Sequence, residues 1–197
     1  MAALVLVLQI LMAAQRWLVT NIRIFGLQSF LLAAIAGTIA AFNSAPHIFL
    51  AAALTLVVKA ILVPLLLESL LERIGIRREI EPFVNVPISV LICGGLTLLG
   101  YVVAESFYHP ADTGGPASLG HNTLAVAISL FLIGFFMMIN RRKALSQVLA
   151  FLSLENGLFL AAISLTYGMP MIVEIGVFFD VLVAVLVMGI LVFRIRE

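Results

Sequence analysis

The chain has 197 residues, of which 63% are apolar and only 11% carry a charge. A soluble domain is about 45–50% apolar and about 25% charged, so this composition cannot cover an ordinary water-exposed surface. The 11 lysines and arginines against 10 acidic residues leave a net charge of +1, which excludes nucleic-acid binding through bulk positive charge. The composition therefore predicts an integral membrane protein.

Apolar stretches follow one another along almost the whole chain. A bilayer core about 30 Å thick needs about 20 apolar residues per helix. Charges, prolines and glycines divide the sequence into predicted spans at 1–18, 24–43, 48–68, 83–104, 122–140, 144–167 and 170–193. No basic residue precedes the first apolar run, as it would in a signal peptide, so we interpret that run as a retained helix. The sequence thus predicts an all-α membrane protein with about seven transmembrane helices.

Basic residues occur in alternate connections. The connections between spans 1 and 2, 3 and 4, and 5 and 6, together with the C-terminal tail, contain Arg16, Arg23, Arg73, Arg77, Arg78, Arg141, Arg142, Lys143, Arg194 and Arg196. The other three connections contain no lysine or arginine. Because positive residues favour the cytoplasmic side, the N-terminus is predicted outside and the C-terminus in the cytoplasm.

The two longest connections differ in character. The stretch from Glu105 to His121 is rich in turn-forming residues and has no periodic apolar pattern, so it predicts an ordered outer loop. The stretch from Glu68 to Glu81 mixes both signs of charge and predicts a solvated inner loop with room for one amphipathic turn.

Four ionisable residues lie at membrane depth, away from the ends of the predicted spans: Lys59, Glu155, Glu174 and Asp180. A charge at the centre of a membrane helix costs about 2.5–3.5 kcal/mol on insertion scales, so such residues usually face a bundle interior and often mark proton or ion paths. Glu155 lies 13 residues before the turn at Gly168 and Asp180 lies 12 after it, which predicts similar depths on adjacent helices. Lys59 reaches a similar depth in span 3, and Glu174 lies about 9 Å farther out. These four residues are the candidates for proton transfer.

Three neighbours of these residues support that interpretation. Pro64 has no N–H, so the carbonyl of Ala60 loses its helix partner and span 3 is predicted to kink, leaving room for water; packing explains this proline equally well. Asn156 supplies two hydrogen-bond donors and an acceptor beside Glu155. Gly157 allows another helix to approach closely.

Other chemistry is poorly represented. Cys93 is the single cysteine, which excludes disulfides within the chain and cysteine-held iron–sulfur clusters, and it is predicted to be a small buried apolar residue. The adjacent Gly94 and Gly95 predict close helix packing. The histidines lie in outer connections and lack metal-binding spacing, so no metal site is predicted. The sequence shows no nucleophile–base arrangement, so no catalytic residue is predicted.

Two stretches carry a resemblance to a known family. They are Val58–Pro64 (VKAILVP) and Arg142–Met188, the latter with LENG at 154–157, VEIG at 173–176 and Asp180. They resemble the HyfE-type membrane subunit, component E of hydrogenase-4 and of related group 4 membrane [NiFe]-hydrogenase or formate hydrogenlyase complexes.

The last three predicted helices resemble, more distantly, NuoK of respiratory complex I and MrpC of cation/proton antiporters. Arg141 and Arg142 match the basic connection of those subunits, and Glu155 and Asp180 match the NuoK acids. Glu155 stands about three residues farther from the basic pair than in NuoK, and Asp180 replaces a glutamate. The resemblance implies four N-terminal helices and an outer loop over 1–119 and a three-helix unit over 120–197.

The resemblance implies a function as well. It implies a non-catalytic subunit of a complex I-like hydrogenase in the inner membrane, with buried charges that link proton movement to redox chemistry in other subunits. Expected partners are antiporter-like and NuoH-like membrane subunits and the hydrogenase and iron–sulfur subunits, which would hold the [NiFe] centre and the clusters; no cofactor is expected on this chain. Two alternatives stay open: a subunit of an Mrp-type monovalent cation/proton antiporter, and a structural scaffold whose charges only lock helices together.

Overall fold

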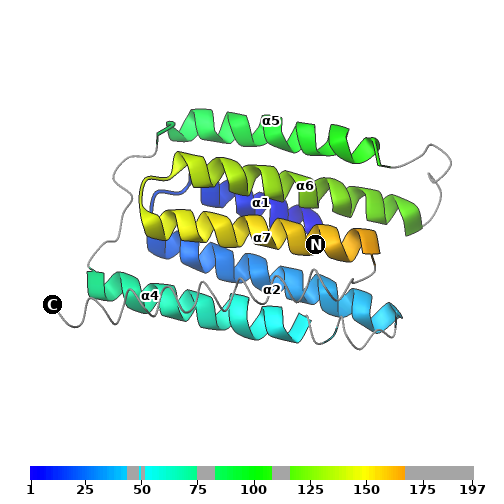
Figure 1. Cartoon of the computed structure of the whole chain (residues 1–197), viewed down its shortest axis with the longest axis horizontal. Coiled ribbons are helices and arrows are strands. Elements are labelled where there is room, and N and C mark those ends of the chain that lie inside the picture. Colours follow the sequence, from blue (N-terminus) through cyan, green and yellow to red (C-terminus); the bar gives the residue numbers. More distant parts are fainter. Residues whose placement is uncertain (44–48, 50–51, 75–82, 108–115, 167–197) are drawn as a thin grey trace.

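The computed structural model describes residues 1–43, 49, 52–74, 83–107 and 116–166 of the chain. The described part is an antiparallel bundle of long helices (Figure 1). Its helices are α1 (Ala2–Ala14), α2 (Leu18–Asn43), η1 (Thr55–Leu62), α4 (Val63–Ile74), α5 (Val86–Glu105), α6 (Pro116–Asn140) and α7 (Ala144–Thr166). The predicted span 170–193, which contains Glu174 and Asp180, lies outside the described residues.

Five stretches of the described chain are long and apolar enough to cross a membrane: Leu18–Ala41, Ala52–Glu72, Val86–Glu105, Asn122–Asn140 and Ala144–Ser164. The second of these joins η1 and α4 into one continuous span. The all-α membrane fold is therefore confirmed. Helix α1 is apolar but has 13 residues, so it is about 20 Å long at about 1.5 Å per residue.

Two N-terminal predictions need correction. The first helix ends at Ala14 rather than near residue 18, and Gln15 is extended, with φ −87° and ψ 139°. Helix α2 begins at Leu18, so Arg23 lies in its second turn and not in the connection before it. A long basic side chain can extend from a helix end to the membrane surface, which explains why the helix includes this arginine.

Two connections are shorter than predicted. Helix α4 continues to Ile74, so Glu68 and the following residues belong to a helix rather than to a solvated loop. Helix α6 begins at Pro116, inside the stretch predicted as an outer loop. Proline suits the first turn of a helix because its missing N–H has no partner there in any case.

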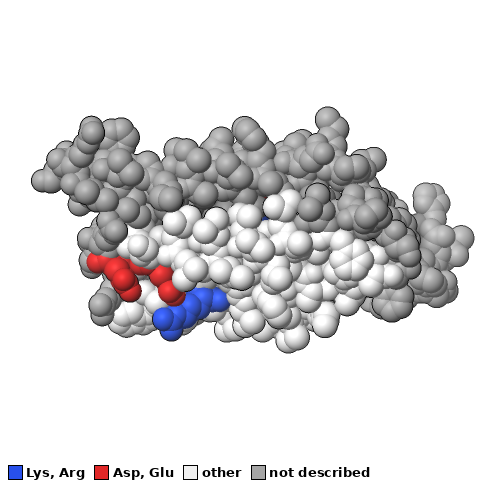
Figure 2. Space-filling view, turned by 90° about the horizontal axis from the view of Figure 1, so that it is seen from below, with Lys and Arg blue, Asp and Glu red and all other residues white. Residues whose placement is uncertain are grey.

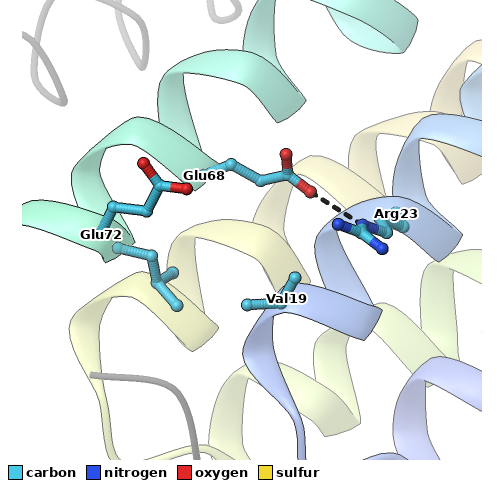
Figure 3. A pocket seen from close by; sticks show the side chains of 5 residues that line it. Val19, Arg23, Glu68 and Glu72 are labelled. Carbon is cyan, nitrogen blue, oxygen red and sulfur yellow. Dashed lines mark hydrogen bonds and ion pairs between the residues drawn. The ribbon is translucent and has the colours of Figure 1, made fainter. Parts of the chain in front are cut away.

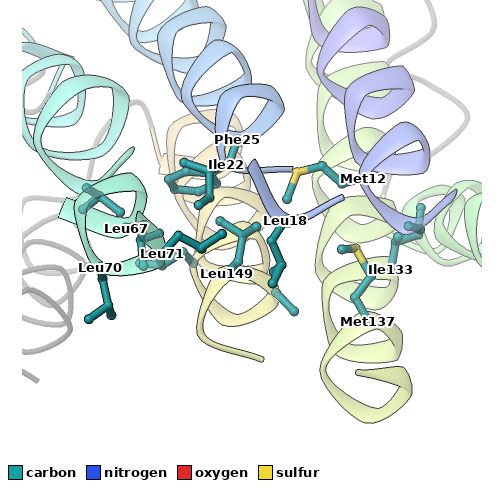
Figure 4. Close-up of a cluster of buried hydrophobic side chains, with 14 of the residues drawn as sticks. Met12, Leu18, Ile22, Phe25, Leu67, Leu70, Leu71, Ile133, Met137 and Leu149 are labelled. Atoms are coloured by element: carbon teal, nitrogen blue, oxygen red, sulfur yellow. The ribbon is translucent and has the colours of Figure 1, made fainter. Parts of the chain in front are cut away.

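Helix α2 contacts α7 as well as the η1–α4 span, and α5 packs against α6 (Figure 1). The largest apolar core lies where α1, α2, α4, α6 and α7 meet (Figure 4). Phe25, Met12 and Ile133 are fully buried there. Each buried aliphatic side chain stabilises such packing through many small dispersion contacts.

Glycines bring α6 and α7 into close contact. A Cβ added at Gly134 would lie 2.7 Å from the Cα of Leu154, and one added at Gly157 would lie 2.7 Å from the nitrogen of Phe131. Real Cβ atoms do not come this close, so both positions require glycine. Gly157 therefore has the close helix contact that its sequence context predicts.

Gly94 and Gly95 differ from their prediction. No described atom lies within 4 Å of a Cβ added at either position, so the pair does not mediate packing within the described bundle. Cys93 beside them is fully buried, as predicted.

Charged side chains gather toward one end of the face shown in Figure 2, and most of the rest of its described surface is uncharged. The α1–α2 and α6–α7 connections, with Arg16 and Arg141–Lys143, lie at the same end as each other (Figure 1). The fold therefore brings these basic segments to one side of the bundle, as alternate connections require.

Candidate functional site

Lys59 of η1 and Glu155 of α7 form an ion pair inside the bundle. The Lys59 Nζ lies 3.2 Å from the Glu155 Oε2, and the two side chains are only 5% and 7% exposed. The sequence predicted similar depths for these two residues. The structure brings them into direct contact from two helices that both pack against α2.

Lys59 lies in the middle of a π-helical segment. Thr55–Leu62 is π-helical, and the Val63 N–H bonds to the carbonyl of Val58, five residues earlier. Pro64 follows directly and has no N–H to offer. The predicted disturbance near Pro64 is therefore a stretch of wider helix, and such segments often occur at functional sites.

Burial makes this pair energetically consequential. A lone charge in a membrane interior is costly, whereas a close opposite charge offsets part of that cost. Removing one partner of a buried ion pair costs about 3–5 kcal/mol because the other charge is left behind. The pair can thus hold helices together or hold a proton that moves between its two groups.

Asn156, the neighbour of Glu155, faces a second buried polar cluster. Its Nδ2 donates to Gln28 Oε1 at 3.4 Å and to Ser29 Oγ at 3.2 Å. Gln28, Ser29 and Asn156 are all fully buried. These contacts join α7 to α2 one residue away from the ion pair.

Gln9 of α1 completes this cluster. Its Oε1 accepts hydrogen bonds from Gln28 Nε2 at 2.8 Å and from Ser153 Oγ, and its Nε2 contacts Met137 Sδ at 3.6 Å. Sequence reasoning missed Gln9, Gln28, Ser29 and Ser153 as part of one site. The available signal was weak: Gln9 is the single polar residue between Met1 and Ala14, and Gln28 and Ser29 are adjacent polar residues within an apolar span.

Arg141 has a structural role that its charge alone did not indicate. It is 2% exposed, and its Nη2 donates to the carbonyls of Met12 at 2.8 Å, Ala13 at 3.4 Å and Gln15 at 2.9 Å. The last carbonyls of a helix have no partner within the helix. The guanidinium therefore caps the C-terminus of α1.

A second ion pair lies at the charged end of the bundle. Arg23 Nε lies 3.1 Å from Glu68 Oε1, with side chains 73% and 32% exposed. The two residues line a small open pocket of about 60 Å³ with Glu72, Val19 and Leu71 (Figure 3). Surface pairs of this kind contribute about 0–1 kcal/mol, so this pair contrasts with the buried one.

The remaining predicted site residues fall into two groups. Pro64 and Gly157 lie beside the ion pair on the same two spans, and each contacts a neighbouring helix closely. Glu174 and Asp180 lie outside the described residues, so their place in the predicted row stays a prediction. Within the described ranges, no group of three or more His, Cys, Asp or Glu side chains could hold a metal ion.

Fold and site together define an all-α, multi-pass membrane protein with a charged pair in its interior. The chain is 29% identical over 168 residues to hydrogenase-4 component E of Escherichia coli and of Shigella flexneri. That match covers 85% of this chain and 75% of the relative. The resemblance to hydrogenase-4 component E is thereby confirmed.

A further relative is the uncharacterized protein Rv0085 of Mycobacterium tuberculosis, which is 37% identical over 145 residues. The match covers 72% of this chain and 63% of that protein's length, just under two thirds. No protein-family model matches the chain. No solved structure matches it either.

Proposed function

We propose that the chain is a non-catalytic membrane subunit of a hydrogenase complex and that its buried charges form part of a proton pathway. Membership of a complex is supported by the similarity to hydrogenase-4 component E, which extends over 85% of the chain. The proton pathway is supported by one observation above all, the contact between Lys59 and Glu155 within the bundle.

The chemistry of the pair suits proton exchange. An ammonium carries protons that a carboxylate can accept, and the Lys59 Nζ lies 3.2 Å from the Glu155 Oε2. Transfer of one proton from Nζ to the carboxylate converts the ion pair into a neutral amine and a neutral acid. A charge change nearby can then bias the proton toward either group.

The pathway extends beyond this pair in our proposal. Asp180 and Glu174, on the predicted span 170–193, continue it along the neighbouring helix. The redox centres, a [NiFe] site and iron–sulfur clusters, belong to partner subunits of a hydrogenase or formate hydrogenlyase type. Antiporter-like and NuoH-like membrane subunits supply the rest of the path through the inner membrane.

Complex membership is tested by purification in mild detergent followed by mass spectrometry. The proposal expects hydrogenase or iron–sulfur subunits to accompany the tagged chain. Co-purification of Mrp-type antiporter subunits alone would contradict it and would favour the cation/proton antiporter. Recovery of the chain without either set of partners would also contradict it.

Assembly of the complex in charge-removing variants distinguishes a proton relay from a structural scaffold. Glu155→Gln, Asp180→Asn and Lys59→Ala each remove one charge, and a proton relay expects them to leave the complex assembled on a native gel while reducing proton movement. A scaffold expects assembly to fail, since stranding one buried charge costs about 3–5 kcal/mol. Glu68→Gln is the matched control, because this acid pairs with Arg23 at the end of the bundle rather than in its interior.

A further inference from the structure

The two partners of the buried ion pair come from two helices that both pack against α2. Lys59 belongs to η1, which packs on one side of α2, and Glu155 belongs to α7, which packs on another (Figure 1). The distance between the two charges therefore depends on the position of each helix against α2.

Gly26 lets the span that carries Lys59 pack closely against α2. A Cβ added at Gly26 would lie 3.2 Å from Pro64 Cγ and 3.4 Å from the carbonyl oxygen of Ala60. Ala60 is the residue after Lys59. The absence of a side chain at Gly26 thus lets the backbone beside Lys59 lie directly against α2, in the manner of small residues at membrane helix interfaces.

Gln28 and Ser29 bind α7, the helix that carries Glu155, through hydrogen bonds. Both accept a hydrogen bond from Asn156 Nδ2, at 3.4 Å and 3.2 Å, and Asn156 precedes Gly157 and follows Glu155 directly. Gln28 is held in turn, because its Nε2 donates to Gln9 Oε1 at 2.8 Å. A fully buried amide left without partners is costly, so these contacts favour one register of α7 on α2.

We propose that the turn Gly26–Ser29 of α2 is a spacer that sets the distance between Lys59 and Glu155. Gly26, Gln28, Ser29 and Asn156 are then positioning residues for the pair. The inference rests on the proposed function for its consequence, since proton exchange needs the two groups within hydrogen-bond reach. Its geometric content is testable without any transport measurement.

The test is a zero-length cross-link in native membranes that contain the full chain. A membrane-permeant carbodiimide activates the Glu155 carboxyl, the Lys59 amine attacks it, and one amide bond forms as the carbodiimide leaves as its urea. Mass spectrometry of the digested chain counts the linked product per inserted chain. The unmodified chain is expected to give this link, and its absence would contradict the pair and the spacer together.

Gly26→Val tests the side of the spacer that faces Lys59. We expect the link yield to fall about tenfold, since a misplacement of about 1 Å can cost about 100-fold in the rate of a positioned reaction. Gly37→Val is the matched control on the same helix, because no described atom lies within 4 Å of a Cβ added there. If Gly26→Val fails to accumulate, Gly26→Ala provides the same test with a smaller displacement. Equal yields in the Gly26 and Gly37 variants would overturn the proposal.

Asn156→Leu and Ser29→Ala test the side that faces Glu155. Both are expected to lower the yield severalfold, whereas Ser29→Thr keeps a hydroxyl acceptor and is expected to retain most of it. Ser164→Ala is the control on α7, because the Ser164 hydroxyl bonds the Leu160 carbonyl of its own helix. Unchanged yield in Asn156→Leu, or equal loss in both Ser29 variants, would overturn this half of the proposal.

The outcomes separate the spacer from the proposed function. If cross-linking follows these expectations while Glu155→Gln leaves proton movement unchanged, the spacer stands and the relay fails. If Glu155→Gln abolishes proton movement while Gly26→Val and Asn156→Leu leave the link intact, the relay stands and the spacer fails.

Discussion

Lys59 shows how far residue-level reasoning reaches. Counting residues from the ends of predicted spans gave similar depths for Lys59 and Glu155, and their charged atoms lie 3.2 Å apart. A count gives depth but not the direction of a side chain. The contact itself depends on the π-helical segment and on the seating of two helices on α2, which no local pattern in the sequence specifies.

Arg141 was predicted only as part of a basic connection. The positive-inside rule explains why a basic residue lies at this end of the bundle but not why its guanidinium is buried. The guanidinium is buried because it binds carbonyls at the end of α1. Ala13, at that end, is 128 residues away from Arg141 along the chain. Such long-range capping cannot be predicted from periodicity.

This capping role predicts that Arg141→Leu destabilises the chain. Hydrogen bonds from a charged donor contribute about 1.5–3 kcal/mol, so we expect a loss of that order with the carbonyls of Met12 and Gln15 left unpaired. The measurement is the midpoint of unfolding of the purified chain in detergent. Arg142→Leu is the control, since Arg142 is exposed with its guanidinium carbon 4.3 Å from the Phe83 ring centroid, an interaction of about 0.5–1 kcal/mol. Equal destabilisation by both variants would contradict the cap.

At the scale of elements, most spans could be predicted and their ends could not. The apolar length of each span places most ends of the described helices within a few residues. The exceptions are the end of α1 at Ala14, the start of α2 at Leu18, the end of α4 at Ile74 and the start of α6 at Pro116. Glycines were a poorer guide. Gly157 contacts α6 closely, whereas Gly94 and Gly95 have no described neighbour within 4 Å, and the sequence offers no feature that separates the two cases.

This difference predicts opposite responses to valine. Gly157→Val places atoms against the Phe131 nitrogen and the Ala127 carbonyl, and overpacking of this kind costs about 1–3 kcal/mol or more. Gly94→Val adds a side chain where no described atom interferes. We expect the first variant to reduce the amount of folded chain in membranes and the second to leave it near normal. Loss of folded protein in Gly94→Val alone would show that the α6–α7 contact is not the limiting one.

At the scale of the whole molecule, alternation of basic connections predicts an orientation. The bundle brings Arg16 and Arg141–Lys143 to one end, and the positive-inside rule predicts that this end is cytoplasmic. The predicted boundary between a four-helix part, 1–119, and a three-helix unit, 120–197, is a matter of resemblance and stays a prediction. Neither the orientation nor this boundary follows from helix packing. Helices pack alike whichever way the bundle inserts into the membrane.

The orientation is tested with tags at the two termini. We expect protease added to intact spheroplasts to remove an N-terminal tag and to leave a C-terminal tag, with both tags lost after the membrane is opened. A cysteine substituted for Arg16 provides a check within the bundle, and a membrane-impermeant reagent is expected to modify it only after the membrane is opened. Protection of the N-terminal tag with loss of the C-terminal tag would reverse the orientation.

The proposed proton pathway is tested most directly by proton movement per hydrogen turnover in inverted membrane vesicles from cells carrying Glu155→Gln. The substitution keeps the volume and most of the hydrogen-bonding capacity of the side chain but removes its exchangeable acid proton. With the complex assembled and hydrogenase turnover retained, we predict at least about a tenfold fall in proton movement per turnover, in the range by which loss of one proton-transfer group slows reactions. Ser164→Ala on the same helix is expected to leave the ratio unchanged. An undiminished ratio in assembled Glu155→Gln complexes would contradict a role for the Lys59–Glu155 pair in proton transfer.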